Sequence, residues 1–184
     1  MSTHRRADAA KNRERIVHEA RELFASASDK VSLEAIARAA GVGIGTLYRH
    51  FPTRDALVEA VYRSELDALD REAERLLADC SGFDAMRQWT DRYAQFVATK
   101  HAMHDALKIA LTSGFGAASE TRTRIRETIA KFLIAGMRDG SIREGLRADD
   151  LTLSLAGALF AATGSDDAQQ VGRVIDLLMA GLRS

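Results

Sequence analysis

A twelve-residue stretch of the sequence, AGVGIGTLYRHF at residues 40–51, combines three glycines at alternate positions with a run of polar and aromatic side chains. Closely spaced glycines are typical of loops that bind phosphate through backbone N–H groups. Thr, Tyr and Arg side chains also bind phosphate oxygens. The stretch therefore indicates a phosphate partner, which is either a nucleotide or the backbone of a nucleic acid.

The nucleotide alternative requires a spacing that the stretch lacks. A dinucleotide-binding loop has the pattern G-x-G-x-x-G after a β-strand, but Thr46 stands where the third glycine should be, and residues 35–40 have a helical pattern. A nucleoside-triphosphate loop needs a lysine directly after its last glycine, and none is present. Both kinds of nucleotide loop are excluded.

A helix-turn-helix motif accounts for the same residues. This motif joins two short helices by a tight turn that contains glycine, and its second helix lies in the major groove of DNA. We expect a first helix from the N-cap Ser32 to Ala40, a turn at Gly41, and a second helix over 43–49. The residues expected to pack inside are Ile36, Ala37, Val42 and Leu47, and those left to project outward are Ile44, Thr46, Tyr48, Arg49 and His50.

The composition predicts an all-α chain of about nine helices. The 184 residues are 46% hydrophobic and include a single proline, Pro52, whereas residues that propagate helices are abundant. Hydrophobic residues recur at helical spacing in seven further segments, namely 8–27, 53–80, 83–99, 101–112, 120–138, 149–163 and 167–182. We expect two domains, 1–53 for DNA binding and 54–184 for effector binding and dimerisation, joined by the long fourth helix.

Charge is unevenly distributed along the chain although the formal net charge is zero. Residues 1–54 hold ten Lys or Arg against six Asp or Glu, so this end favours a polyanionic partner. The single cysteine, Cys80, excludes an intramolecular disulfide and a multi-cysteine zinc site. The N-terminus has no apolar run and the longest uncharged stretch is too short and polar to span a membrane. A cytoplasmic protein without membrane contact is expected.

The residues that carry the DNA-binding pattern also carry a family resemblance. VSLEAIARAAGVGIGTLYRHFPTRDALVEAVY, residues 31–62, resembles the TetR family of transcriptional regulators, and the preceding NRERIVHEARELF is similar to the first helix of that family. The resemblance covers about residues 12–62, and the rest of the chain is similar only in its helical layout. It implies a homodimeric regulator, a repressor released from a pseudo-palindromic operator by a small molecule.

The resemblance also implies roles for matching positions. Phosphate contacts are implied for Ser32, Thr46, Tyr48, His50 and Arg54. Base contacts would come from Ile44, through a thymine methyl group, and from Arg49, at a guanine edge. The resemblance also implies that Arg5 and Arg6 lie on an arm that enters the minor groove. Because glycine has no side chain, we expect Gly43 and Gly45 to let the backbone at the start of the reading helix lie close to DNA. Gly43 departs from the family, which usually has a serine-like cap there, so the reading helix lacks a side-chain N-cap.

Aromatic and methionine side chains in the middle helices have two interpretations. They either form ordinary core or line an effector cavity between helices; the candidate ligand-binding residues are Trp89, Tyr93, Phe96, Met103, His104 and Phe132. A regulator without a small-molecule effector, acting alone or with a protein partner, therefore remains the alternative. We expect no cofactor, no metal site and no catalytic activity, because no acid–base or ligand constellation is present.

The helix expected over 149–163 is apolar on two faces. Such a helix is either fully buried or shared between the core and a dimer interface. Dimerisation is assigned to the last two helices, and the candidate interface residues are Leu151, Leu155, Leu159, Val171, Ile175 and Leu178.

Overall fold

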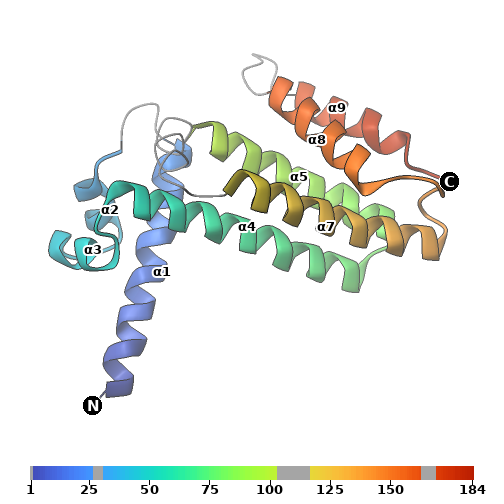
Figure 1. Cartoon of the computed structure of the whole chain (residues 1–184). Coiled ribbons are helices and arrows are strands. Elements are labelled where there is room, and N and C mark those ends of the chain that lie inside the picture. The colour runs from blue at the N-terminus through green and yellow to red at the C-terminus, as the bar shows by residue number, and fades with distance from the viewer. Residues whose placement is uncertain (1, 27–30, 103–116, 163–168) are drawn as a thin grey trace. The chain divides into compact units, whose positions relative to one another are not determined.

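The computed structural model describes residues 2–26, 31–102, 117–162 and 169–184. These residues form eight helices and no strand (Figure 1), which confirms the all-α prediction. The helices are α1 (Ser2–Ser26), α2 (Leu33–Ala39), α3 (Ile44–His50), α4 (Arg54–Asp79), α5 (Gly82–Ala102), α7 (Ala117–Asp139), α8 (Ala148–Ala162) and α9 (Gln170–Ala180). No helix among them is long and apolar enough to cross a membrane.

The start of the first helix corrects one prediction. Helix α1 begins at Ser2 rather than near Asp8, so Arg5 and Arg6 lie in its first turns and not on an arm that precedes it. Residues 2–10 contain neither proline nor glycine, and Arg and Ala are strong helix formers, so the helix extends further than its apolar face. The side chains of Arg5 and Arg6 lie outside the described residues.

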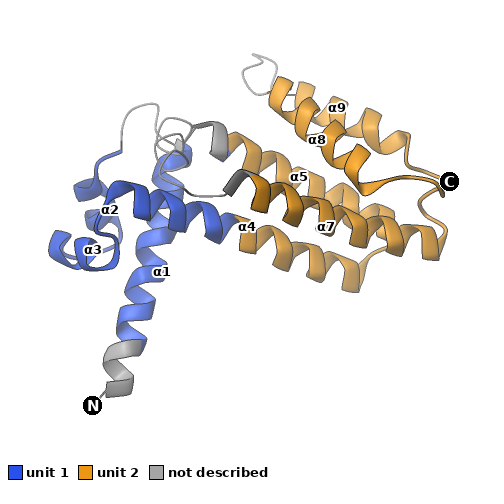
Figure 2. Cartoon of the chain, in the orientation of Figure 1, with its two compact units in different colours: residues 1–65, 99–115 blue, residues 66–98, 116–184 orange. Residues whose placement is uncertain are grey.

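The contacts divide the chain into two compact units (Figure 2). Unit 1 comprises residues 1–65 and 99–115, and unit 2 comprises residues 66–98 and 116–184. The predicted boundary between residues 53 and 54 coincides with the start of α4, whereas the two units divide within that helix. The helix predicted over 101–112 lies outside the described residues, except that residues 101 and 102 end α5.

The core of unit 1 is built from one apolar stripe on each of its helices. Helices α1, α2 and α3 all contact one another, and Pro52 lies between α3 and α4, where the helical pattern must break. Thr53 then caps α4 by accepting a hydrogen bond from the Ala56 N–H at 3.1 Å. The buried side chains include Ile16, Val17, Ala20, Phe24, Ile36, Ala37, Leu47, Phe51, Leu57, Val58 and Val61.

In unit 2 the end of α7 is joined to the start of α5. The Gly82 N–H donates to the Asp139 carboxylate at 2.7 Å, and the Phe83 N–H donates to the Ser141 hydroxyl at 3.1 Å. A Cβ on Gly82 would lie 2.1 Å from the backbone nitrogen of Gly136, so only glycine allows this approach. Side chains 57 and 58 residues away in sequence thus cap α5.

This cap predicts a stability that depends on pH. Hydrogen bonds from Ser141 and from the Gly82 N–H lower the pKa of Asp139 from its ordinary 3.8. The stabilisation is therefore present above pH 3.8 and is lost as the pH falls through the lower folded-state pKa. We expect Asp139→Asn to lower the thermal midpoint at neutral pH, and the difference from wild type to become smaller as the pH falls below 3.8.

The measurement is thermal unfolding followed by circular dichroism across that pH range. Glu144→Gln is the control, because it removes an exposed acid from the connection that follows α7. A difference between Asp139→Asn and wild type that persists unchanged to low pH would contradict the capping role.

Candidate nucleic-acid interface

Helix α2 begins as the sequence predicts. The Ser32 hydroxyl accepts a hydrogen bond from the Ala35 N–H at 3.1 Å, and the Ile36 N–H reaches the Ser32 carbonyl at 3.2 Å. Ser32 has an extended backbone conformation, as an N-cap residue requires. The Ser32 hydroxyl therefore caps α2. Because Ser32 is exposed, this hydroxyl is also accessible to a further partner.

The turn between α2 and α3 ends the first helix in a Schellman motif. Gly41 has a φ of +62°, which a glycine adopts without strain. Its N–H donates to the Arg38 carbonyl at 3.1 Å, and the Val42 N–H donates to the Ala37 carbonyl at 2.9 Å. The prediction that Gly41 makes the turn is confirmed.

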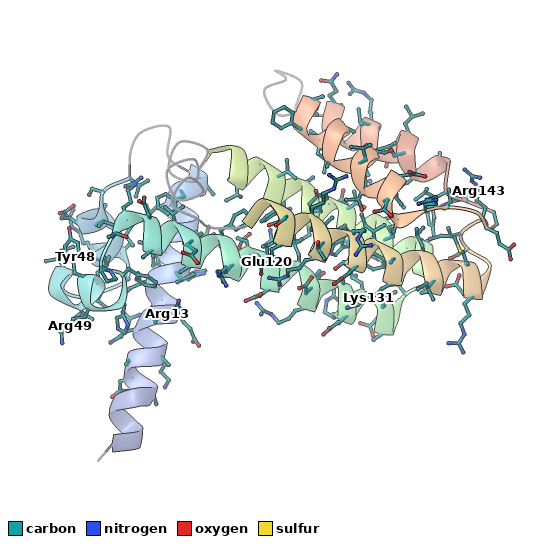
Figure 3. All side chains as sticks on the ribbon, viewed as in Figure 1. Arg13, Tyr48, Arg49, Glu120, Lys131 and Arg143 are labelled. Carbon is teal, nitrogen blue, oxygen red and sulfur yellow. The ribbon has the colours of Figure 1, made fainter. Side chains whose placement is uncertain are left out.

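Helix α3 has one buried face and one exposed face. Leu47 is fully buried against unit 1, whereas Ile44 and Tyr48 are 39% and 45% exposed. Arg49 is exposed as well, and Thr46 and His50 are half-buried. Figure 3 labels Tyr48 and Arg49 on the outer side of this helix. The residues predicted to project outward thus all belong to α3, and the buried Leu47 anchors this helix in unit 1.

The start of α3 lacks a side-chain cap, as predicted for Gly43. The N–H groups of Thr46 and Leu47 both reach the Gly43 carbonyl, at 2.8 Å and 3.2 Å. A Cβ built on Gly43 or Gly45 meets no heavy atom within 4 Å. The protomer's own packing therefore does not require glycine at either position.

Arg49 is folded back on its own helix. Its Nε donates to the Gly45 carbonyl at 3.1 Å, and Nη2 donates to the Thr46 hydroxyl at 3.3 Å. Both bonds are exposed, and exposed polar contacts contribute little net free energy. Arg49 can therefore exchange these bonds for another partner at little cost.

Three arginines hold this motif through contacts that the sequence pattern did not predict. The Arg13 guanidinium lies 5.1 Å from the Phe51 ring centroid, and that of Arg54 lies 5.5 Å from the Phe24 ring centroid. Arg54 also donates to the Val31 carbonyl, and Arg15 to the Ala40 carbonyl. Periodicity cannot reveal these contacts, because their partners are 23 to 38 residues away along the chain.

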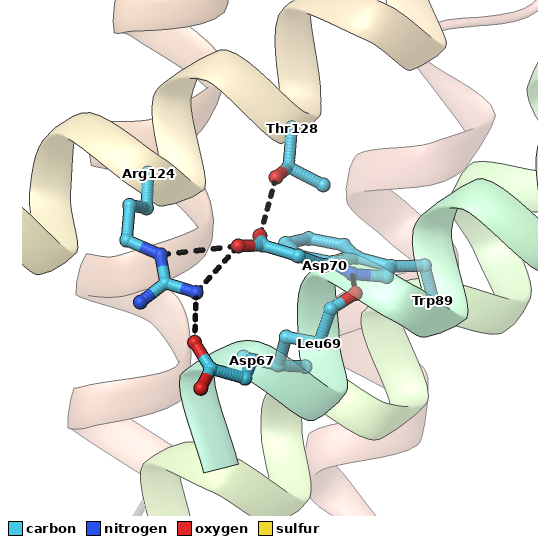
Figure 4. A network of polar contacts seen from close by, with 6 residues as sticks. All are labelled: Asp67, Leu69, Asp70, Trp89, Arg124 and Thr128. Carbon is cyan, nitrogen blue, oxygen red and sulfur yellow. Dashed lines mark hydrogen bonds and ion pairs between the residues drawn. The ribbon is translucent and has the colours of Figure 1, made fainter. Parts of the chain in front are cut away.

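The predicted ligand-binding side chains that are described lie inside unit 2. Trp89, Tyr93, Phe96 and Phe132 are all buried. The Trp89 ring stacks on Tyr93 with centroids 5.2 Å apart and contacts Phe132 at 5.5 Å. Its Nε1 donates to the Leu69 carbonyl at 3.1 Å (Figure 4), so this N–H is already bonded within the chain. Met103 and His104 lie outside the described residues.

A polar network beside Trp89 joins α4 to α7 (Figure 4). Arg124 contacts Asp67 at 2.7 Å and donates through Nε to Asp70 at 3.1 Å, and the Thr128 hydroxyl donates to Asp70 at 3.2 Å. Burial alone would lower the pKa of Arg124, but its hydrogen bonds to Asp70 and Asp67 raise that pKa above the usual value. The guanidinium stays charged and fixes the second part of α4 to α7.

The two faces of α8 have different environments. Leu151, Leu155 and Leu159 are buried within the protomer, and so is Ile175 of α9. Val171 and Leu178 are half-buried. The fully buried alternative for α8 is wrong, because its other face exposes large apolar side chains.

These exposed apolar side chains are not the ones that the sequence analysis selected for the interface. They are Leu153, Phe160 and, on α9, Leu177, which are 66%, 71% and 75% exposed. Four of the six predicted interface residues are buried within the single chain. Helical periodicity shows that two apolar faces exist, but it does not show which of them meets the core.

Comparison with protein families gives two matches that together cover most of the chain. Residues 16–61 match the family described as bacterial regulatory proteins, tetR family. Residues 82–184 match the C-terminal domain of SbtR-like transcriptional regulators. The first match contains both helices of the motif and the turn between them.

Solved structures and curated proteins agree with these matches. The TetR transcriptional regulator SCO0520 of Streptomyces coelicolor is 37% identical, with a TM-score of 0.84 over 93% of this chain and 98% of that one. A TetR regulatory protein of Mycobacterium vanbaalenii is 31% identical, with a TM-score of 0.77 over 97% and 99%. An HTH-type transcriptional regulator of Staphylococcus aureus is 34% identical over 50% of each chain. The chain thus spans about half the length of the curated relatives it matches.

Proposed function

The chain belongs to the TetR family of bacterial transcriptional regulators, and we propose that it is a repressor that binds a pseudo-palindromic operator as a homodimer. In this proposal each α3 lies in the major groove of one half-site, with half-site centres about 34 Å apart. Repression follows because the bound dimer excludes other proteins from the same DNA. The protein would act in the cytoplasm, where the bacterial chromosome lies.

The observation that carries the proposal is the two-sided character of α3. Leu47 is buried and anchors the helix, while Ile44, Tyr48 and Arg49 of the same helix are exposed. This arrangement leaves Ile44 to contact a thymine methyl group and Arg49 to donate to a guanine edge. Phosphate contacts are proposed for Ser32, Thr46, Tyr48, His50 and Arg54, and DNA contacts for Arg5 and Arg6 in the first turns of α1.

The proposed dimer surface is the exposed apolar face of α8 and α9. Its central side chains are Leu153, Phe160 and Leu177, and half-buried Val171 and Leu178 lie on the same pair of helices. Apolar side chains of this size are seldom left exposed together on a monomer surface. A second copy of the chain, related by a two-fold axis, would cover them.

Release by a small molecule is the proposed regulation. The aromatic cluster of Trp89, Tyr93, Phe96 and Phe132 is the proposed effector region, because aromatic side chains commonly line ligand sites within helical bundles. A ligand would weaken DNA binding only by the factor by which it binds the DNA-free form of the regulator more tightly than the DNA-bound form. The alternative is a regulator with no small-molecule effector. The ring contacts of Trp89 with Tyr93 and Phe132 favour this alternative, because packed rings leave less space for a ligand.

The direct test is protection of DNA by the full chain. Footprinting on the segment upstream of its own gene, at several salt concentrations and with candidate metabolites added, should show a pseudo-palindromic protected site. Failure to protect any pseudo-palindromic segment at low salt would contradict the operator proposal. Protection that no metabolite reverses would favour regulation without a small molecule.

Arg49→Ala should change which sequences are preferred. Loss of a bidentate contact to a base removes about 1–3 kcal/mol of discrimination at one base pair, so affinities for operator variants at that position should converge. The measurement is competition binding over a set of single-base variants, with Tyr48→Phe as control. Because Tyr48 is proposed to contact phosphate, that control should weaken all variants alike. A uniform loss for Arg49→Ala would contradict base contact.

A further inference from the structure

We infer that Arg15 of α1 is a positioning residue, which holds the turn between α2 and α3 and thereby sets the orientation of the reading helix. The inference rests on the proposed DNA binding by α3. Arg15 would act without touching DNA, through the backbone of the turn.

The first observation is the bond at the end of α2. The Arg15 guanidinium donates from Nη2 to the carbonyl of Ala40, the C-cap residue of that helix. Carbonyls at a helix C-terminus lack intrahelical donors and carry the negative end of the helix dipole. The N–H groups of Gly41 and Val42 bond to earlier carbonyls, so neither of them serves Ala40. A cation is well suited to this carbonyl.

The second observation is the space that Gly41 leaves. A Cβ built on Gly41 would lie 2.7 Å from Nη2 of Arg15, closer than van der Waals contact allows. The φ of +62° favours glycine at position 41, and the end of the Arg15 side chain lies where a methyl group would be, so it would have to shift if residue 41 were alanine. Arg15 and Gly41 form a complementary pair across 25 residues of sequence.

The position of this pair explains why it matters for α3. Only Gly41, Val42 and the cap Gly43 separate Ala40 from the start of that helix. Since α3 is seven residues long, the turn and the buried side chain of Leu47 fix its direction. Arg13, also on α1, contacts Phe51 at the far end of α3. Helix α1 therefore holds the chain on both sides of the reading helix.

The salt dependence of DNA binding distinguishes an arginine that contacts a phosphate from one that only positions the reading helix. Each cation that neutralises a phosphate contributes about 0.9 to the slope of log affinity against log salt concentration. A positioning residue contributes to affinity and not to this slope. We expect Arg15→Gln to weaken operator binding about tenfold with an unchanged slope, and Arg15→Lys to recover part of the loss.

Arg38→Gln is the matched control, because Arg38 is an exposed arginine in the last turn of α2. It removes the same charge from the same end of the helix without removing the bond to Ala40. Binding is measured well below the thermal midpoint of each variant, so that unfolding does not enter. A slope that falls by about 0.9 in Arg15→Gln would identify Arg15 as a phosphate contact and overturn the inference, as would equal affinities of Arg15→Gln and Arg38→Gln.

A double-mutant cycle tests the pair without DNA. Gly41→Ala should raise the unfolding equilibrium constant more in wild type than in Arg15→Gln, by about two- to threefold, because the new methyl group shifts the end of the Arg15 side chain away from the Ala40 carbonyl only where that arginine is present. Equal effects in the two backgrounds would overturn the pairing. If the wild-type chain binds no operator, the proposed function fails, whereas this cycle still decides whether Arg15 holds the turn.

Discussion

Phe160→Glu is expected to make the chain monomeric and to weaken operator binding by on the order of 100-fold. Phe160 is 71% exposed in the single chain and lies on the same helix as Leu153; this helix contacts α9, which exposes Leu177. Glutamate in the proposed apolar interface would be buried without a partner, and this opposes association strongly. A monomer would bind each half-site separately, so the added affinity that comes from linking two DNA-binding domains would be lost.

Sedimentation or light scattering measures the oligomeric state, and titration of an operator measures binding. Ile134→Glu is a suitable control, because Ile134 of α7 is 67% exposed but lies outside α8 and α9. It should leave both measurements unchanged. A Phe160→Glu chain that remains dimeric would show that another surface mediates association.

Trp89→Ala is expected to lower the free energy of unfolding by about 3–5 kcal/mol. Trp89 is fully buried and contacts Tyr93 and Phe132 through its ring. The substitution removes these contacts and also the donor of the Leu69 carbonyl, and the rigid surroundings close only part of the cavity.

Chemical denaturation of wild type, Trp89→Phe and Trp89→Ala measures this effect. Phenylalanine retains much of the ring volume and loses only the N–H, so it should cost less than alanine. A loss below about 1 kcal/mol for Trp89→Ala would contradict a packed core at this site. It would indicate an open space around the ring.

The helices and the motif could be predicted from local signals. Ser32, Gly41 and Thr53 mark helix ends because their side chains or backbone satisfy the groups that a helix end leaves unbonded. Apolar spacing gave the buried face of each helix in unit 1. These signals depend on residues within about four positions of one another along the chain. They can therefore be recognised in a single sequence.

The contacts that position the interface could not be predicted in this way. Arg13, Arg15 and Arg54 are hydrophilic and look like solvent-exposed or DNA-binding residues, yet each contacts a ring or a carbonyl elsewhere in unit 1. Leu151 and Leu153 on α8 have the same chemistry, but one is buried and the other exposed. In both cases the answer depends on tertiary packing, which periodicity does not contain.

The empty surroundings of Gly45 have a consequence for engineering. A glycine inside a helix destabilises it by about 0.5–1 kcal/mol relative to alanine, and nothing in the protomer would resist a methyl group there. A search for more thermostable variants would therefore select alanine at this position. If α3 approaches DNA closely at Gly45, that search would select against the regulator's own activity. Thermal stability of the free chain and affinity for the operator are then opposed at this one residue. Thermal stability alone is therefore a misleading guide to improving this protein.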